Sequence, residues 1–177
     1  MAITTDQLHR WHRFLFREDF GSAGKVRRGS SEYPVVVIEG DGEVRRRPQR
    51  GSDPQRIGPE LDETCRAFQA HIDSVGAGGG VVDMTAGTLA ATRLYASILR
   101  IHPYEDGNLR AAFVALQAAL RSQGMWAVYF DDIERHDKEL GWALRNDDAQ
   151  DRRPFANLLV ERLEAIRQAA SEGTLES

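Results

Sequence analysis

The nine residues HPYEDGNLR at positions 102–110 stand between two segments with the apolar spacing of helices, residues 89–99 and 111–120. Both flanking segments are rich in Ala and Leu, which favour helix. Pro103 ends the first helix, because the residue before a proline is disfavoured in the helical region. Gly107 permits a turn. The sequence therefore predicts a tight loop that ends one helix and opens the next.

The same run carries the residue types of a phosphate site. The free N–H groups of a helix that begins near Asn108 attract anions, and Arg110 adds a forked set of donors. Asp106 is a hard oxygen ligand that can hold Mg²⁺ together with nucleotide oxygens and water. His102, with an ordinary pKa of about 6.5, can take a proton from an attacking hydroxyl. These residues predict transfer of a phosphorus-containing group to an alcohol, although His-Pro and Asp-Gly pairs also punctuate ordinary helices.

The run resembles the signature of the Fic/Doc family. That signature reads His-Pro-Phe, any residue, Asp or Glu, Gly-Asn-Gly-Arg, two variable residues and a second Arg. The positions that match it are His102, Pro103, Asp106, Gly107, Asn108 and Arg110, with Tyr104 as a near match for the aromatic residue. Two positions depart from it. Leu109 stands where the nucleotidyl-transferring branch has Gly and the Doc branch has Lys, and Phe113 replaces the second arginine.

The resemblance extends beyond the motif, from about Leu8 to Leu163. Residues 24–27 are similar to the family's Gly-Lys-x-Arg segment, and residues 147–159 to its closing Asp/Pro/Phe-Leu segment. The segment from Tyr33 to Arg47 resembles its flap hairpin. The resemblance implies a mainly α fold, a Fic-like helical bundle with a small β-hairpin flap.

The resemblance also implies roles for the residues of the motif. The histidine at the place of His102 is the general base for a Ser, Thr or Tyr hydroxyl of a target protein, and the acid at the place of Asp106 holds Mg²⁺. The co-substrate is a nucleoside triphosphate, most simply ATP, from which AMP or another nucleoside monophosphate is transferred. The residues expected to bind the nucleotide are Gly107, Asn108, Leu109 and Arg110. The base of the nucleotide is expected along residues 126–142.

The two departures leave other functions open. Leu109 removes the backbone freedom of glycine and projects a branched side chain beside the phosphate site. Phe113 lies three residues beyond Arg110, on a neighbouring helix face, and cannot donate to a γ-phosphate. Doc-like proteins also lack the second arginine and transfer a γ-phosphoryl group, so a Doc-like protein kinase is one alternative. A catalytically degenerate relative that binds nucleotide or protein is the other.

The flap segment from Tyr33 to Arg47 predicts two strands, residues 33–38 and 43–47, joined by a turn at residues 40–42. An exposed strand edge could pair with an extended segment of the target protein. The first strand is apolar on both faces, so packing against the helical body is the other interpretation. A cluster of arginines at positions 45–47 and 50 favours an acidic partner protein over nucleic acid, because no nucleic-acid motif accompanies it and the net charge is -4.

Composition favours one domain, residues 1–170, followed by a disordered tail at 171–177. With 177 residues, 41% of them hydrophobic, the chain can build one sizeable core, and no apolar run approaches the roughly 20 residues of a membrane helix. The N-terminus shows no secretory signal, and Cys65 is the only cysteine. We therefore expect a bacterial cytoplasmic protein without membrane or nucleic-acid partners, with export as an effector as the alternative.

The remaining patterns predict further helices at residues 5–16, 59–75, 131–145 and 154–170. His9 and His12 are expected on a solvated helix face, and Trp126, like the other tryptophans, in helix packing. Many Fic-like proteins carry an inhibitory helix with Ser or Thr four residues before a Glu-Gly pair. Gln168 occupies that place here. We expect no internal inhibitory glutamate, while the resemblance allows a separate antitoxin as a partner.

Overall fold

The computed structural model describes residues 2–18, 21–38, 44–77, 83–145 and 149–172, and the statements that follow concern these residues. They form a mainly α fold with one antiparallel hairpin, as the sequence predicted. The elements in chain order are α1 (Thr5–Phe16), β1 (Glu32–Ile38), β2 (Val44–Arg50), α2 (Ile57–Ala77), α3 (Met84–Ile101), α4 (Asn108–Ser122), α5 (Ile133–Arg145) and α6 (Ala149–Ser171).

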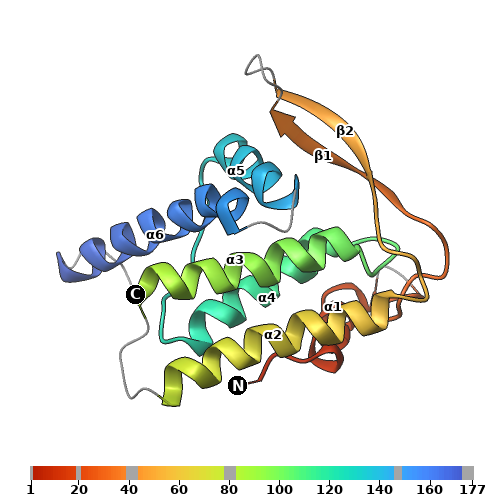
Figure 1. Cartoon of the computed structure of the whole chain (residues 1–177), viewed down its shortest axis with the longest axis horizontal. Helices are drawn as coiled ribbons and strands as arrows, with labels where there is room; N and C mark the ends of the chain where they lie inside the picture. The colour runs from red at the N-terminus through yellow and green to blue at the C-terminus, as the bar shows by residue number, and fades with distance from the viewer. Residues whose placement is uncertain (1, 19–20, 39–43, 78–82, 146–148, 173–177) are drawn as a thin grey trace.

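Helix α3 lies at the centre of the bundle and contacts α2, α4, α5 and α6 (Figure 1). Its buried side chains, among them Leu94, Tyr95 and Ala96, cover more than half of its circumference. A helix that is apolar most of the way round belongs in the interior of a bundle. One apolar core extends from Ile3 to Leu163 and includes Cys65, which confirms that this cysteine is a core residue.

Three helices begin earlier than the sequence predicted, and one of them, α6, begins at Ala149, five residues before Pro154. Helix α3 begins at Met84 because Asp83 caps it, its side chain accepting the N–H of Thr85 at 3.2 Å. Helix α2 begins at Ile57, two residues before Pro59, and the first turn of a helix tolerates proline. Helix α6 continues through Ser171, the first residue of the predicted tail.

The hairpin formed by β1 and β2 projects from the helices (Figure 1). Glu32 pairs with Arg50 at its base, and Val35 pairs with Arg47 further out. Its second strand therefore extends beyond the predicted end, whereas the predicted turn at residues 40–42 lies outside the described residues. Strand β1 contacts α5, so the strand packs on the helical body as the second interpretation expected.

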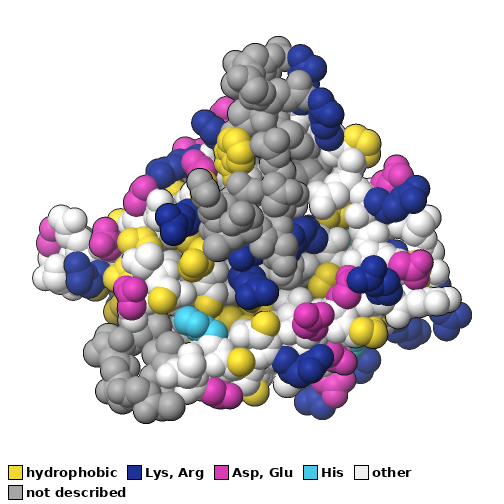
Figure 2. Space-filling model, viewed as in Figure 1, with side chains coloured by type: hydrophobic (Ala, Val, Ile, Leu, Met, Phe, Trp, Pro, Cys, Tyr) yellow, Lys and Arg dark blue, Asp and Glu magenta, His cyan; other side chains and the backbone are white. Residues whose placement is uncertain are grey.

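Two expectations about individual side chains were wrong. His12 is only 2% exposed, because loops from two distant parts of the chain close over it. Trp126 is 56% exposed and does not pack among the helices. On the face shown in Figure 2, basic and acidic side chains are interspersed over the surface. Within the described residues, every helix is too short or too polar to cross a membrane.

Candidate active site

The loop between α3 and α4 begins and ends with residues in the left-handed conformation. His102 has φ 50° and ψ 61°, and the loop closes at Gly107 with φ 74°. The N–H of His102 still bonds to the carbonyl of Ile98 at 3.0 Å, so the histidine caps α3. Among the described residues, His102 is the only non-glycine residue with positive φ. Such strain persists only where surrounding contacts hold it, and it clusters at functional sites.

The imidazole of His102 is held by side chains on both sides. Tyr33 of β1 stacks on it with ring centroids 4.3 Å apart and planes within 5° of parallel. The hydroxyl of Ser31 lies 2.8 Å from Nδ1. The amide nitrogen of Asn108 lies 3.3 Å from Nδ1 and 3.2 Å from Nε2. The ring therefore has little freedom to rotate.

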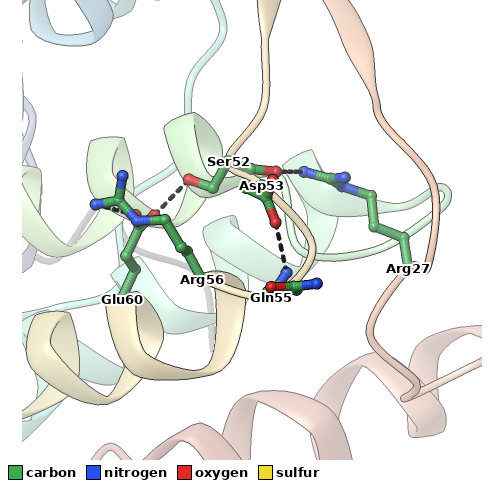
Figure 3. Close-up of polar contacts among 6 residues, drawn as sticks. All are labelled: Arg27, Ser52, Asp53, Gln55, Arg56 and Glu60. Carbon is green, nitrogen blue, oxygen red and sulfur yellow. Dashed lines mark hydrogen bonds and ion pairs between the residues drawn. The ribbon is translucent and has the colours of Figure 1, made fainter.

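Arg27 holds the main chain of His102 in place. Its guanidinium donates to the carbonyls of His102 at 2.6 Å and Ile101 at 3.4 Å, and also to those of Gly29 and Ser52. Figure 3 shows it reaching Ser52, on the segment that joins β2 to α2. Arg27 is only 3% exposed, and burial lowers its pKa. These bonds stabilise the strained conformation at the end of α3.

Asn108 closes the loop with its side chain. Its amide oxygen accepts the N–H of Tyr104, and its amide nitrogen donates to the carbonyl of Tyr104, both at 2.9 Å. The side chain of Asn108 is therefore committed to the loop itself. The first N–H groups of a helix lack partners within that helix, so the main chain at the start of α4 offers the donors on which the predicted anion site depends.

The buried side chain of His12 connects the loop to the segment that follows α1. The Nδ1 atom of His12 accepts the N–H of Gly24 at 2.8 Å, so its Nε2 carries the proton and donates to the carbonyl of Asp106 at 2.9 Å. The ring also stacks on Tyr104 at 3.8 Å. Burial lowers the pKa of His12, which agrees with this neutral form. Sequence reasoning missed this role because both partners are main-chain groups remote in the chain.

Two features disfavour any residue other than glycine at position 107: the left-handed backbone conformation and the closeness of Phe16. A Cβ atom at this position would lie 2.4 Å from Cε2 of Phe16. The ring of Phe16 in turn lies beneath the guanidinium of Arg110, whose central carbon is 5.5 Å from the ring centroid. Asp106 is exposed, and its Oδ1 accepts the N–H of Gly107 at 2.6 Å.

All the predicted site residues line one cavity of about 440 Å³. Its lining consists of Phe16, His102, Glu105, Asp106, Gly107, Asn108, Leu109 and Arg110. An adjoining cavity of about 340 Å³ shares His102, Asn108 and Leu109 with it. The hairpin and α5 form the other walls of this second cavity, where α5 contributes three residues of the expected base-binding region, Asp137, Leu140 and Gly141. The side chain of Leu109, which is 52% exposed, lies where the two cavities meet.

Phe113 does not line either cavity. It packs against the apolar core, with its ring centroid 6.1 Å from that of Phe130. A larger cavity of about 690 Å³ lies between α2 and α3, and its lining extends to Ile101, the last residue of α3 before the loop. Its Glu60 accepts from Ser52 and pairs with Arg56 at 2.9 Å (Figure 3). We place the candidate site at the cavity of about 440 Å³, because its lining combines the held imidazole of His102, the first turn of α4 and the carboxylate of Asp106.

The residues at this cavity fit Mg²⁺. Asp106 and Glu105 bring carboxylates to the cavity, and Mg²⁺ commonly takes one or two carboxylates, with phosphate oxygens and water as its other ligands. In the described part of the chain, no three His, Cys, Asp or Glu side chains are gathered closely enough to hold a metal ion by themselves. A magnesium ion here would therefore be shared with a bound phosphate group.

The electrostatics of the site keep its histidine neutral. Burial, with a further contribution from the charge of Arg27, lowers the pKa of His102 to about 4, against the opposing effect of Asp106. Burial also raises the pKa of Tyr33 to about 12, so the stacked ring is uncharged. At neutral pH His102 therefore has a free lone pair and can accept a proton.

The fold and the loop are those of a known class of protein. The family model of the Fic/DOC family matches residues 2–120, more than half of the chain, and the chain belongs to this family. No curated protein sequence matches it significantly.

Solved structures show the same fold at low identity. A Fic family protein from Desulfovibrio desulfuricans is 16% identical with a TM-score of 0.68, over 100% of this chain and 50% of that one. A fragment of Fic-1 from C. elegans is 17% identical with a TM-score of 0.66, over 97% and 44%. BepC from Bartonella tribocorum, a VirB-translocated effector protein solved with bound AMPPNP, is 19% identical with a TM-score of 0.64, over 90% and 73%. This chain also spans only 60% of a Fic-domain signalling protein from Bacteroides thetaiotaomicron.

Proposed function

We propose that the protein is a Fic-type transferase that moves a nucleoside monophosphate, most simply AMP from ATP, to a hydroxyl group of a target protein. The observation that carries this proposal is a neutral, firmly held His102 in the same cavity as Asp106, Arg110 and the first turn of α4. Membership of the Fic/DOC family supports it. The AMPPNP bound in the BepC structure supports ATP as the nucleotide.

The residues divide the chemistry among them. The main-chain N–H groups at the start of α4 bind phosphate oxygens, and Arg110 adds a charged donor at the rim of the cavity. Asp106 would hold Mg²⁺, and the ion would supply positive charge to the phosphates. His102 removes the proton from the incoming hydroxyl. The hydroxyl oxygen bonds to the α-phosphorus while the bond to the bridging oxygen breaks, and pyrophosphate leaves.

The adjoining cavities favour a nucleotide over a free phosphate group. The first cavity contains the phosphate-binding groups, and the second leads from His102 to Leu140 of α5 between hairpin and helix. A phosphate chain in the first and a nucleoside in the second would occupy both. Leu109, at their junction, then sets the path of the nucleotide.

A Doc-like kinase is the second candidate, and the placement of Phe113 favours it. This residue packs in the core where the family motif has its second arginine, so this position offers no charged donor to a γ-phosphate. Without that contact, the triphosphate could bind in the reverse direction, and its γ-phosphoryl group would then lie near His102.

Labelled ATP separates these candidates. The protein and its His102→Ala variant are incubated with Mg²⁺, a bacterial lysate and ATP labelled at the α- or the γ-phosphate. Label transferred to protein from the α position, and lost in the variant, is the expected result. Label from the γ position alone identifies a kinase. Absence of transfer with either label would contradict both activities and favour a nucleotide-binding relative.

A further inference from the structure

Residues at the open end of the hairpin contact His102, the proposed general base, from the sides of both strands. We define the hairpin foot as Ser31 and Tyr33 at the start of β1 and Gly51 and Ser52 after β2. Gly51 donates its N–H to the carbonyl of Ser31 at 2.9 Å, and Ser52 donates to that of Ile101 at 3.1 Å. A Cβ atom on Gly51 would lie 3.0 Å from the Cβ of His102. The foot therefore packs directly against the end of α3.

The foot is also fixed to the helices. The hydroxyl of Tyr33 donates to the carbonyl of Arg100 in α3 at 3.3 Å. Ser52 donates its hydroxyl to Glu60 in α2, as Figure 3 shows. Contacts with two helices hold Ser31 and Tyr33 at fixed positions beside His102.

Ser31 contacts only one of the two ring nitrogens of His102. Asn108 turns its amide nitrogen, not its oxygen, toward the ring, because the oxygen accepts from Tyr104. That nitrogen lies 3.3 Å from Nδ1 and 3.2 Å from Nε2, so it does not distinguish them, whereas the hydroxyl of Ser31 contacts Nδ1 at 2.8 Å. With Nδ1 bonded to Ser31, Nε2 is left for the target hydroxyl. A base at Nε2 requires the proton on Nδ1, and the Ser31 hydroxyl then accepts it.

We propose that Ser31 and Tyr33 are positioning residues for His102. Ser31 accepts the Nδ1–H bond and so makes Nε2 the nitrogen that takes the proton of the target hydroxyl, and Tyr33 fixes the plane of the ring by stacking. The flap segment thereby prepares the base, in addition to any contact it makes with a target. The assignment of the proton to Nδ1 and its effect on turnover rest on the proposed transfer activity, whereas the stacking of Tyr33 and the contact of Ser31 with Nδ1 do not.

The tautomer of the His102 ring can be measured without substrate. In nucleotide-free protein labelled with ¹⁵N at histidine, we expect the nitrogen shifts of His102 at pH 7 to report a protonated Nδ1 and an unprotonated Nε2. In Ser31→Ala this preference weakens, and in Ser31→Thr, which keeps the hydroxyl, it is retained. A protonated Nε2 in the unsubstituted protein would overturn the proposal, and so would a Ser31→Ala spectrum without change.

Kinetics measure what the positioning contributes. Loss of one hydrogen bond to the base predicts a fall in kcat of about fivefold to tenfold in Ser31→Ala, with an unchanged KM for ATP and recovery in Ser31→Thr. Tyr33→Phe keeps the stacked ring and should retain most of kcat, whereas Tyr33→Leu should lose more. Equal kcat values in Tyr33→Phe and Tyr33→Leu would overturn the role of stacking. If the shifts agree but no transfer is found, the positioning holds and the proposed function fails.

Discussion

Replacement of Gly107 by alanine tests the geometry of the loop by two separate effects. The residue has φ 74°, and a left-handed conformation costs a non-glycine residue about 1–2 kcal/mol. The added Cβ would also lie 2.4 Å and 2.5 Å from two carbons of Phe16, which is only 2% exposed. Overpacking of a buried ring costs a further amount of about 1–3 kcal/mol. We therefore expect Gly107→Ala to lower the free energy of unfolding by about 2–5 kcal/mol.

Gly124 provides the matched control, because it has φ 76° and no neighbouring atom within 4 Å of an added Cβ. Urea unfolding of Gly124→Ala should therefore show only the conformational cost, about 1–2 kcal/mol. In a Phe16→Ala background, where the clashing ring is absent, Gly107→Ala should cost no more than Gly124→Ala. In the unsubstituted background, Gly107→Ala should lower the free energy of unfolding by more than Gly124→Ala does; an equal or smaller loss would contradict the predicted clash with Phe16.

Three further predictions concern buried titratable groups. His102 has a folded pKa of about 4, below the value of about 6.5 in an unfolded chain, so its contribution to stability is complete above pH 6.5 and is lost as the pH falls toward 4. An NMR titration of its ring should have its midpoint near 4, and a midpoint near 6.5 would contradict the burial argument. His12→Leu should lower the free energy of unfolding by about 2–4 kcal/mol in urea, because the N–H of Gly24 and the carbonyl of Asp106 lose their partner. His12→Gln should lower it by less. An unchanged free energy of unfolding in His12→Leu would show that His12 does not stabilise the loop. Cys65 is buried and has its pKa raised to about 11, so alkylation at pH 8 should be at least about a hundredfold slower in folded protein than in urea, and equal rates would contradict its burial.

The part of the site that could be predicted from sequence is the part encoded locally. Proline and glycine mark where α3 ends and α4 begins, and the residues between them can only enter one short loop. For this reason His102, Asp106 and Arg110 were expected in one place, and they line one cavity. The hairpin was predicted on the same local grounds, from a β-branched run followed by a turn.

The residues that hold the loop could not be predicted, because their partners are distant and are mostly main-chain groups. The side chain of Arg27 donates to four carbonyls, which every residue possesses, so the contact could not be predicted although residues 24–27 resemble a segment of the family. Tyr33 was predicted as the first residue of the flap and Ser31 was given no role, although both contact His102 about 70 residues away. His12 was expected on a solvated face for the same reason: its burial depends on loops that only the tertiary fold brings together.

The central claim is that this loop transfers a nucleoside monophosphate with His102 as the base. The most direct measurement is mass spectrometry of lysate proteins after incubation with Mg²⁺, ATP and either the protein or its His102→Ala variant. We expect peptides that gain the mass of AMP on Ser, Thr or Tyr with the unsubstituted protein, and none above background with the variant. Equal modification by both proteins, or no nucleotidyl-modified peptide with either, would contradict it.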